Sequence, residues 1–172
     1  MQPHSLSTIR RMCEFGARPS IIRSYFWDVN ITTIRDIYRE AAGEDPPKGQ
    51  LPDVTDKCFD FKFAVQSSVV AKVYSESINA GASKVDALIH ACEMLTAMFK
   101  GCETLSFSYV WLISRNLEIG QFGLQSCTEG HTYLRKKDLF AAPCPVCKEM
   151  RKLDLKIARE VKKRAKTRCV NL

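Results

Sequence analysis

The chain has 172 residues, of which 45% are hydrophobic, so it can form one domain with a buried core, or a domain plus a small appendage. It contains no run of about eighteen apolar residues, so we expect no transmembrane helix, and its first residues lack the pattern of a secretory signal. We therefore expect a cytosolic protein, and the formal net charge of +7 proves to be confined to one segment.

Residues 1–43 are predicted to form a helix-turn-helix-like unit of three short helices, because apolar residues recur at helical spacing. Asn30 is a preferred N-cap residue before the third helix, and Gly43 suits its end. Two short helices with a tight connection resemble a helix-turn-helix. Arg35 and Arg39 would lie on the outward face of the third helix, where they are candidate DNA contacts. The alternative is an ordinary three-helix packing unit with a solvated face.

Residues 44–55 are predicted to be a rigid linker. Three prolines and a glycine lie within the nine residues from Glu44 to Pro52. Each proline lacks an N–H group and restricts its own backbone and that of the residue before it. This composition excludes a helix and separates the N-terminal unit from the middle of the chain.

Residues 56–120 are predicted to form a helical assembly body. One helix is expected over Asp56–Ala80, a second from the N-cap Ser83 to Gly101, and a third from about Thr104 to Ile119. The loops between them are short, so the three helices should pack as antiparallel neighbours. Four single cysteines lie in the two helical regions, residues 1–43 and 56–120, and are predicted to be small buried hydrophobic residues: Cys13, Cys58, Cys92 and Cys102.

Residues 121–172 contain a metal-ligand pattern. Cys127-x3-His131 is followed, after twelve intervening residues, by Cys144-Pro-Val-Cys147, and four such ligands suit one tetrahedral zinc ion. The Cys-x2-Cys pair is the most specific part of the pattern, and His131 is the least specific. Residues 125–131 and 142–147 are expected to be turns, with a short strand at 132–134. A site whose four positions are all filled by protein ligands would be structural. The alternative is that the cysteines are reduced and bind no metal.

The segment Lys148–Arg168 holds ten Lys and Arg and three acids, a net charge of +7. This equals the net charge of the whole chain, so the positive and negative charges of the other residues cancel. The segment is predicted to be a helix with an apolar stripe and a cationic back, because four apolar residues recur at spacings of three or four: Met150, Leu153, Ile157 and Val161. With no aromatic residue interleaved, the cations favour phosphate contact. The candidate DNA contacts are Lys152, Lys156, Arg159, Lys162, Lys163 and Arg164. The alternative is the solvated face of a docked helix.

The segment Asp36–Pro52 resembles part of the FlhC family of flagellar transcriptional activators, in which a Tyr-x-Glu-x-x-Gly helix end leads into Pro-Pro-Lys-Gly-x-x-Pro. Here the two motifs read Tyr38-Arg-Glu-Ala-Ala-Gly43 and Pro46-Pro-Lys-Gly-Gln-Leu-Pro52. The order that follows is also similar, with helices, Leu-Gln-Ser-Cys127, a Cys-x2-Cys pair and a basic tail. The resemblance covers roughly residues 5 to 165.

This resemblance implies a mostly α-helical transcriptional regulator with one structural zinc ion. It also implies assembly with an FlhD-like subunit, binding to promoter DNA and recruitment of RNA polymerase. The zinc of the family is held by four cysteines, and Cys127, Cys144 and Cys147 match three of them. The fourth would fall on Gly130, which cannot bind a metal, and His131 is the obvious substitute.

The sequence therefore predicts a mainly α fold: a helical body with an N-terminal helix-turn-helix-like unit and a small zinc-ribbon-like segment followed by a basic helix. The leading hypothesis is a zinc-stabilised DNA-binding activator that acts in a hetero-oligomer. A helical adaptor with a structural zinc and no DNA binding is the alternative. An enzyme with Cys127 as nucleophile and His131 as base would need an orienting group and an oxyanion site, and the sequence offers neither.

Overall fold

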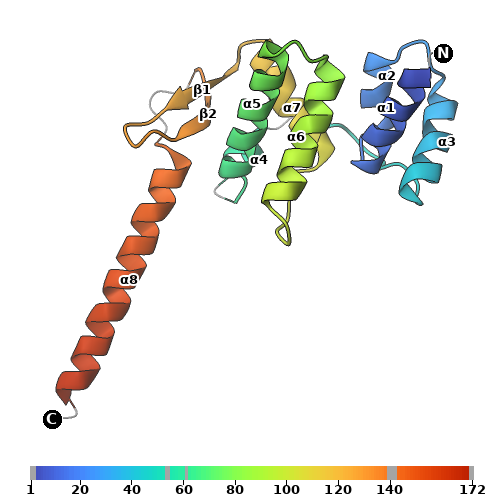
Figure 1. Cartoon of the computed structure of the whole chain (residues 1–172). Coiled ribbons are helices and arrows are strands. Elements are labelled where there is room, and N and C mark those ends of the chain that lie inside the picture. The colour runs from blue at the N-terminus through green and yellow to red at the C-terminus, as the bar shows by residue number, and fades with distance from the viewer. Residues whose placement is uncertain (1–2, 53–54, 61, 139–142, 171–172) are drawn as a thin grey trace.

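The structure is a computed structural model that describes residues 3–52, 55–60, 62–138 and 143–170, and the side chains of these residues except 3–4 and 161–170. The described residues form eight helices and one antiparallel hairpin, so the predicted mainly α fold is confirmed (Figure 1). In chain order the elements are α1 (Pro3–Glu14), α2 (Pro19–Tyr25), α3 (Ile31–Ala42), α4 (Asp56–Phe59), α5 (Ala64–Asn79), α6 (Lys84–Met98), α7 (Phe107–Glu118), β1 (Phe122–Ser126), β2 (Thr132–Lys136) and α8 (Pro145–Val170).

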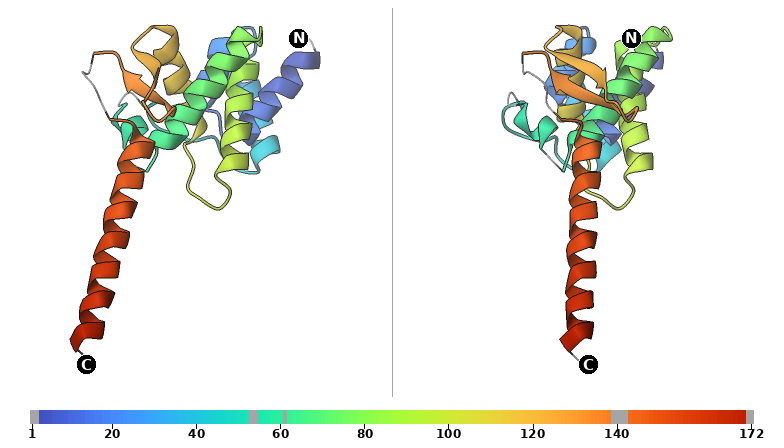
Figure 2. Two further views of the ribbon diagram at one scale, coloured as in Figure 1. Left: turned by 60° about the vertical axis from the view of Figure 1, so that its left-hand side comes forward. Right: turned by 90° about the vertical axis from the view of Figure 1, so that its left-hand side faces the viewer.

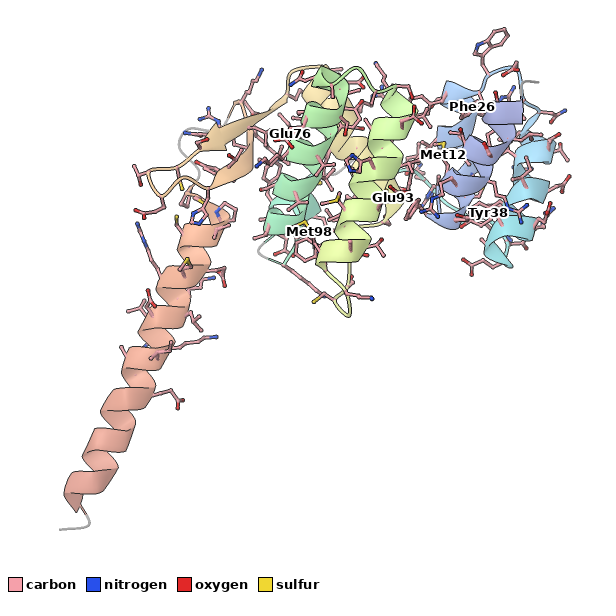
Figure 3. The ribbon with its side chains drawn as sticks, in the orientation of Figure 1. Met12, Phe26, Tyr38, Glu76, Glu93 and Met98 are labelled. Atoms are coloured by element: carbon pink, nitrogen blue, oxygen red, sulfur yellow. The ribbon has the colours of Figure 1, made fainter. Side chains whose placement is uncertain are left out.

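The N-terminal helices α1, α2 and α3 pack around a small core that contains Met12 and Tyr38 (Figure 3). The predicted caps of α3 are confirmed, since the Asn30 side chain accepts from the Thr32 N–H and Gly43 has the left-handed φ of 73°. This unit joins the body through α1 and α6, where Arg11 on α1 forms an ion pair with Glu93 at 2.9 Å.

The predicted linker has neither helix nor strand in its described residues 44–52 and 55, and its residues 53–54 lie outside the described part. The Arg18 guanidinium donates to the carbonyl oxygens of Gly49 and Gln50, each at 2.8 Å. These bonds tie the linker back to the start of α2.

The single helix predicted over Asp56–Ala80 is wrong, because the chain breaks between α4 and α5. Asp60 has an extended backbone (φ −59°, ψ 140°), and its carbonyl oxygen accepts from the N–H groups of Phe63 and Ala64, which begin α5. Helix α5 then lies at the centre of the body and packs against α6, α7 and β2. Figure 1 shows α5 and α6 side by side and joined by a short loop, as predicted.

The connection between α6 and α7 is fixed by a buried side chain of α5. Gln66 is 3% exposed; its amide nitrogen donates to the Glu103 carbonyl oxygen at 2.8 Å, and its oxygen accepts from the Leu105 N–H at 2.9 Å. Because these bonds hold the chain extended before Ser106, α7 begins at Phe107 rather than at Thr104.

The hairpin β1–β2 also rests on α5. The buried Ser68 hydroxyl donates to the Ala64 carbonyl and accepts from the Leu134 N–H of β2 at 3.0 Å. The Phe59 ring meets the Phe122 ring of β1 edge-on, with centroids 5.1 Å apart. Strand β1 was not predicted, since Gln125 and Ser126 were assigned to a turn, whereas both pair with β2.

Helix α8 extends away from the body in every view of Figures 1 and 2. The contact between α8 and α5 is made near the base of the helix. Beyond it, Met150, Leu153 and Ile157, which the sequence predicts to form an apolar stripe, are more than half exposed. No helix of the described residues is both long and apolar enough to cross a membrane.

Replacement of Gln66 by Met tests the role of this residue in the core. The variant keeps the side-chain length but leaves the buried Leu105 N–H without an acceptor, so we expect the free energy of unfolding to fall by about 2–3 kcal/mol. Urea denaturation followed by helical circular dichroism measures the change. Lys72→Met, an exposed position on the same helix, is the control and should change stability by less than about 0.5 kcal/mol. Equal stability of the two variants would contradict the assigned role.

Candidate metal centre and basic surfaces

The turn of the hairpin presents two of the predicted ligands. Cys127 and His131 flank the turn directly after the last β pair, Ser126 with Thr132. The Cys127 N–H donates to the His131 carbonyl at 3.0 Å. Gly130 has a φ of 80°, in the left-handed region that favours glycine. The turn therefore closes tightly enough for both side chains to face the same side.

The other two ligands lie at the start of α8. The Cys144 carbonyl accepts from the Lys148 N–H at 3.0 Å, so Cys144 is the residue that caps the helix and Pro145 is its first residue. Proline is favoured there because the N–H it lacks would have no partner in the helix. Cys147 is in the first turn. Both residues thus lie at the N-terminal end of α8, which is the positive end of the helix dipole.

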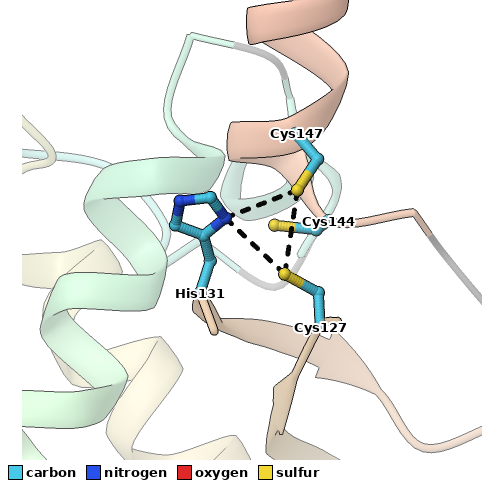
Figure 4. A group of neighbouring side chains, drawn as sticks. All are labelled: Cys127, His131, Cys144 and Cys147. Atoms are coloured by element: carbon cyan, nitrogen blue, oxygen red, sulfur yellow. Dashed lines mark hydrogen bonds between the residues drawn. The ribbon is translucent and has the colours of Figure 1, made fainter. Parts of the chain in front are cut away.

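The four ligand atoms converge in one cluster, with all of them within 4.8 Å of one another (Figure 4). The Cys127 and Cys147 sulfurs are 3.7 Å apart, and the His131 Nδ1 atom lies 3.6 Å from the first and 3.4 Å from the second. A tetrahedral site with zinc bond lengths requires sulfur–sulfur edges of about 3.8 Å and sulfur–nitrogen edges of about 3.6 Å. The three separations among Cys127, His131 and Cys147 match such edges, so the cluster is a candidate metal centre.

The titration of the cluster shows why a cation suits it. Desolvation raises the pKa of the Cys127 thiol, but hydrogen bonds from the N–H groups of His131 and Glu129, and from the Cys147 and His131 side chains, lower it overall to about 7. Desolvation and the adjacent sulfurs of Cys127 and Cys144 raise the pKa of Cys147 to about 11. The Cys127 thiolate therefore forms readily, and its negative charge disfavours ionisation of the adjacent Cys147 thiol. A divalent ion would remove that conflict by binding all the sulfurs.

The prediction for the single cysteines is confirmed in part. Cys13, Cys58 and Cys92 are buried, and desolvation raises the pKa of Cys13 to about 11. Cys102 is exposed, so the prediction was wrong there, because the residue lies in the loop after Gly101 rather than on the apolar face of a helix. The groups next to Cys127 and His131 are the thiols of Cys144 and Cys147. Such an environment is typical of a metal site rather than of a catalytic nucleophile and its base.

The predicted cations of α8 fall into two groups. Lys152, Lys156 and Arg159 are exposed on the projecting part of the helix. Lys152 forms an ion pair with Glu149 at 3.1 Å. The side chains of Lys162, Lys163 and Arg164 lie outside the described residues, although the helix itself continues through them.

Arg35 and Arg39 lie on the exposed face of α3, as predicted, beside an open hollow of about 550 Å³ between α2, α3 and the linker. Arg39 is held by Asp36 at 3.0 Å and by Asp45 at 2.8 Å. Arg18 and Lys48 line the same hollow. The sequence did not predict that these two bases would lie beside Arg35 and Arg39. They are distant in the sequence, and only the folding of the linker onto α2 brings them together.

Comparison with known proteins agrees with the resemblance inferred from the linker. A family model described as flagellar transcriptional activator (FlhC) matches residues 3–158. The flagellar transcriptional regulator FlhC of Gallionella capsiferriformans (strain ES-2) is 34% identical over 98 residues, which are 54% of this chain and 54% of that relative. The chain therefore matches about half the length of that relative. Both descriptions are of transcriptional regulators rather than of enzymes.

Replacement of His131 tests the cluster as a metal site. Without the imidazole only three ligands remain, so we expect His131→Ala to lose stoichiometric metal on dialysis, whereas His131→Cys should keep it. Metal content per chain, measured by mass spectrometry, gives the result. His90→Ala removes an exposed histidine of α6 and should leave the metal content unchanged. Full metal occupancy in His131→Ala would exclude His131 as a ligand.

Proposed function

The chain belongs to the FlhC family of flagellar transcriptional activators, and we propose that it is a zinc-stabilised, DNA-binding activator of flagellar or motility promoters. In this proposal it acts in a hetero-oligomer with an FlhD-like subunit and recruits RNA polymerase. The observation that carries the proposal is the convergence of four metal ligands at the base of a helix whose segment holds the net positive charge of the chain.

The metal in this proposal is one zinc ion bound by Cys127, His131, Cys144 and Cys147. Three thiolates and an imidazole are a soft donor set that zinc favours in structural sites. The three separations among Cys127, His131 and Cys147 are close to the edges of a tetrahedral zinc site. Four protein ligands would leave no position for a reactive water, so the ion would hold the hairpin and the first turn of α8 together.

The basic side of α8 supports direct contact with DNA phosphates. Lys152, Lys156 and Arg159 are exposed, and Lys162, Lys163 and Arg164 extend the same segment. No aromatic residue occurs between Lys148 and Arg168, which favours contact with phosphates over stacking with bases.

A second DNA contact is proposed at α3. Arg35 is exposed and lines the hollow that Arg18 and Lys48 also line. Arg35 is a stronger candidate than Arg39, because two carboxylates already neutralise the Arg39 guanidinium. These contacts would come from the opposite end of the molecule to α8 (Figure 1).

Salt dependence of DNA binding tests the α8 contacts. We expect Lys152→Ala, Lys156→Ala and Arg159→Ala combined to weaken binding to duplex promoter DNA and to reduce the slope of log K against log salt by about 0.9 per lost phosphate contact. A fluorescence-anisotropy titration between low and moderate salt measures both.

The control combines Arg23→Ala, Lys72→Ala and Lys100→Ala, which removes the same charge from exposed positions outside α8. It should keep most of the affinity. Equal losses in the two triple variants would show that only the net charge matters. An unaltered chain that binds no DNA at any salt concentration, either alone or in complex with an FlhD-like subunit, would favour the helical adaptor instead.

Replacement of Cys144 tests whether the metal centre supports DNA binding. Cys144→Ala removes one ligand and the N-cap residue at the start of α8, so we expect loss of metal and weaker DNA binding through the altered attachment of the helix. Metal analysis and an electrophoretic mobility-shift assay measure the two effects. Cys102→Ala, an exposed cysteine outside the cluster, is the control. Normal DNA binding by metal-free Cys144→Ala would show that the metal does not support the DNA contact.

A further inference from the structure

The candidate metal centre contains two thiols that lie close enough to react with each other. The sulfurs of Cys127 and Cys147 are 3.7 Å apart, whereas the sulfurs of a disulfide bond are about 2.05 Å apart. Rotation of the two side chains about their Cα–Cβ bonds moves the sulfurs over distances of this order. The fold therefore places two cysteines from different elements in a position from which a disulfide can form.

These two thiols are also the accessible ones of the cluster. Cys127 and Cys147 are half-buried, whereas Cys144 is buried, with 5% of its surface exposed. A small oxidant in the solvent therefore reaches the sulfurs of Cys127 and Cys147 more easily than that of Cys144. Accessible thiols with a second thiol beside them are the ones that oxidise reversibly, because the second thiol captures the first oxidation product as a disulfide.

We propose that Cys127 and Cys147 are a peroxide-sensitive redox pair, whose disulfide replaces a bound metal as the link between the hairpin and α8. Cys127 lies in the hairpin turn and Cys147 in the first turn of α8, so their disulfide joins the two elements that the metal would join. The oxidised centre keeps only Cys144 and His131 as donors, and two donors do not complete a four-coordinate site. Oxidation and metal binding therefore exclude each other.

The oxidation takes place in two steps. In the first, one of the two sulfurs attacks hydrogen peroxide, the O–O bond breaks, and a sulfenic acid and one water form. In the second, the other sulfur attacks the sulfenic sulfur, the S–S bond forms, and the hydroxyl group leaves with a proton as a second water. The two thiols lose two electrons and one peroxide becomes two waters. Small thiols reverse the reaction by thiol–disulfide exchange.

The competing product is a disulfide between Cys144 and Cys147, which are close in sequence. That bond would join the cap of α8 to its own first turn and would leave the hairpin unattached. Access disfavours it, because Cys144 is buried while the Cys127 sulfur faces that of Cys147 (Figure 4). His131 cannot take part in a disulfide, so oxidation of the cluster ends with one bond and one remaining thiol.

The experiment uses the full chain, both as purified and after removal of metal with a chelator. Each sample is treated with hydrogen peroxide, the remaining thiols are alkylated, and disulfides are mapped by mass spectrometry without reduction. We expect the Cys127–Cys147 disulfide to exceed all disulfides of Cys144 by at least about tenfold, because access and proximity decide which sulfurs pair. A chromogenic chelator should detect one metal ion released per disulfide, and dithiothreitol with added zinc should restore both thiols and metal.

Two controls separate the effect of the fold from that of the sequence. Cys144→Ser and Cys102→Ser should both still form the Cys127–Cys147 disulfide, because neither removes a reacting sulfur. In denaturant the preference should reverse toward Cys144–Cys147, since a short loop closes more easily than a long one in an unfolded chain.

Three outcomes would overturn the proposal: a predominant disulfide of Cys144 in the folded chain, irreversible oxidation of Cys127 or Cys147 without a disulfide, and full metal occupancy in the oxidised chain. The pairing does not depend on DNA binding or on a bound metal. If the reduced chain binds no metal, the proposed zinc centre alone is contradicted, because the disulfide map of the metal-free chain still tests the redox pair.

Discussion

The position of α8 depends on four ligand atoms that meet where the hairpin and the helix adjoin. Cys127 and His131 come from the hairpin turn, whereas Cys144 and Cys147 belong to the cap and first turn of the helix. Since α8 otherwise contacts the body near its base, little apolar packing is available to hold it. A short cluster of strong bonds can replace a hydrophobic interface at such a junction, and a bound metal ion supplies bonds of that kind.

The cluster can hold α8 only because the hairpin is itself fixed. Strand β2 receives the Ser68 hydroxyl through the Leu134 N–H, and β1 places Phe122 against the Phe59 ring. Ser68 and Gln66 lie in the first turns of the buried helix α5 and bind the hairpin and the α6–α7 connection respectively. The helical body thus acts as a rigid support, and the orientation of α8 follows from α5 through the hairpin and the ligands.

The sequence predicted those parts of this arrangement that depend on local chemistry. Asn30 and Ser83 are recognised because each accepts from a backbone N–H two or three residues further along the chain. The Cys-x2-Cys pair is recognised because its own short spacing places two sulfurs on one turn. The break at Asp60 and strand β1 were missed, because both depend on contacts with residues far along the chain: Phe59 turns toward Phe122, and β1 exists only where β2 pairs with it. The stripe of α8 was predicted, but its exposure was not, since periodicity alone cannot show whether a partner surface lies within the same chain.

A metal ion bound by the cluster would also fix the rotation of α8 about its own axis. Each residue turns the helix by about 100°, so displacement of the first turn by a single residue would move the bases toward the position of the apolar stripe. Cys144 and Cys147 would both bind the ion from the start of the helix, and two ligands on one turn would leave α8 no freedom to rotate. A helix that is to bind phosphates through its basic side would need such a restraint, because the bases would otherwise not face the DNA. The cluster at the base of α8 therefore matters more for the direction of the side chains than for the stability of the helix.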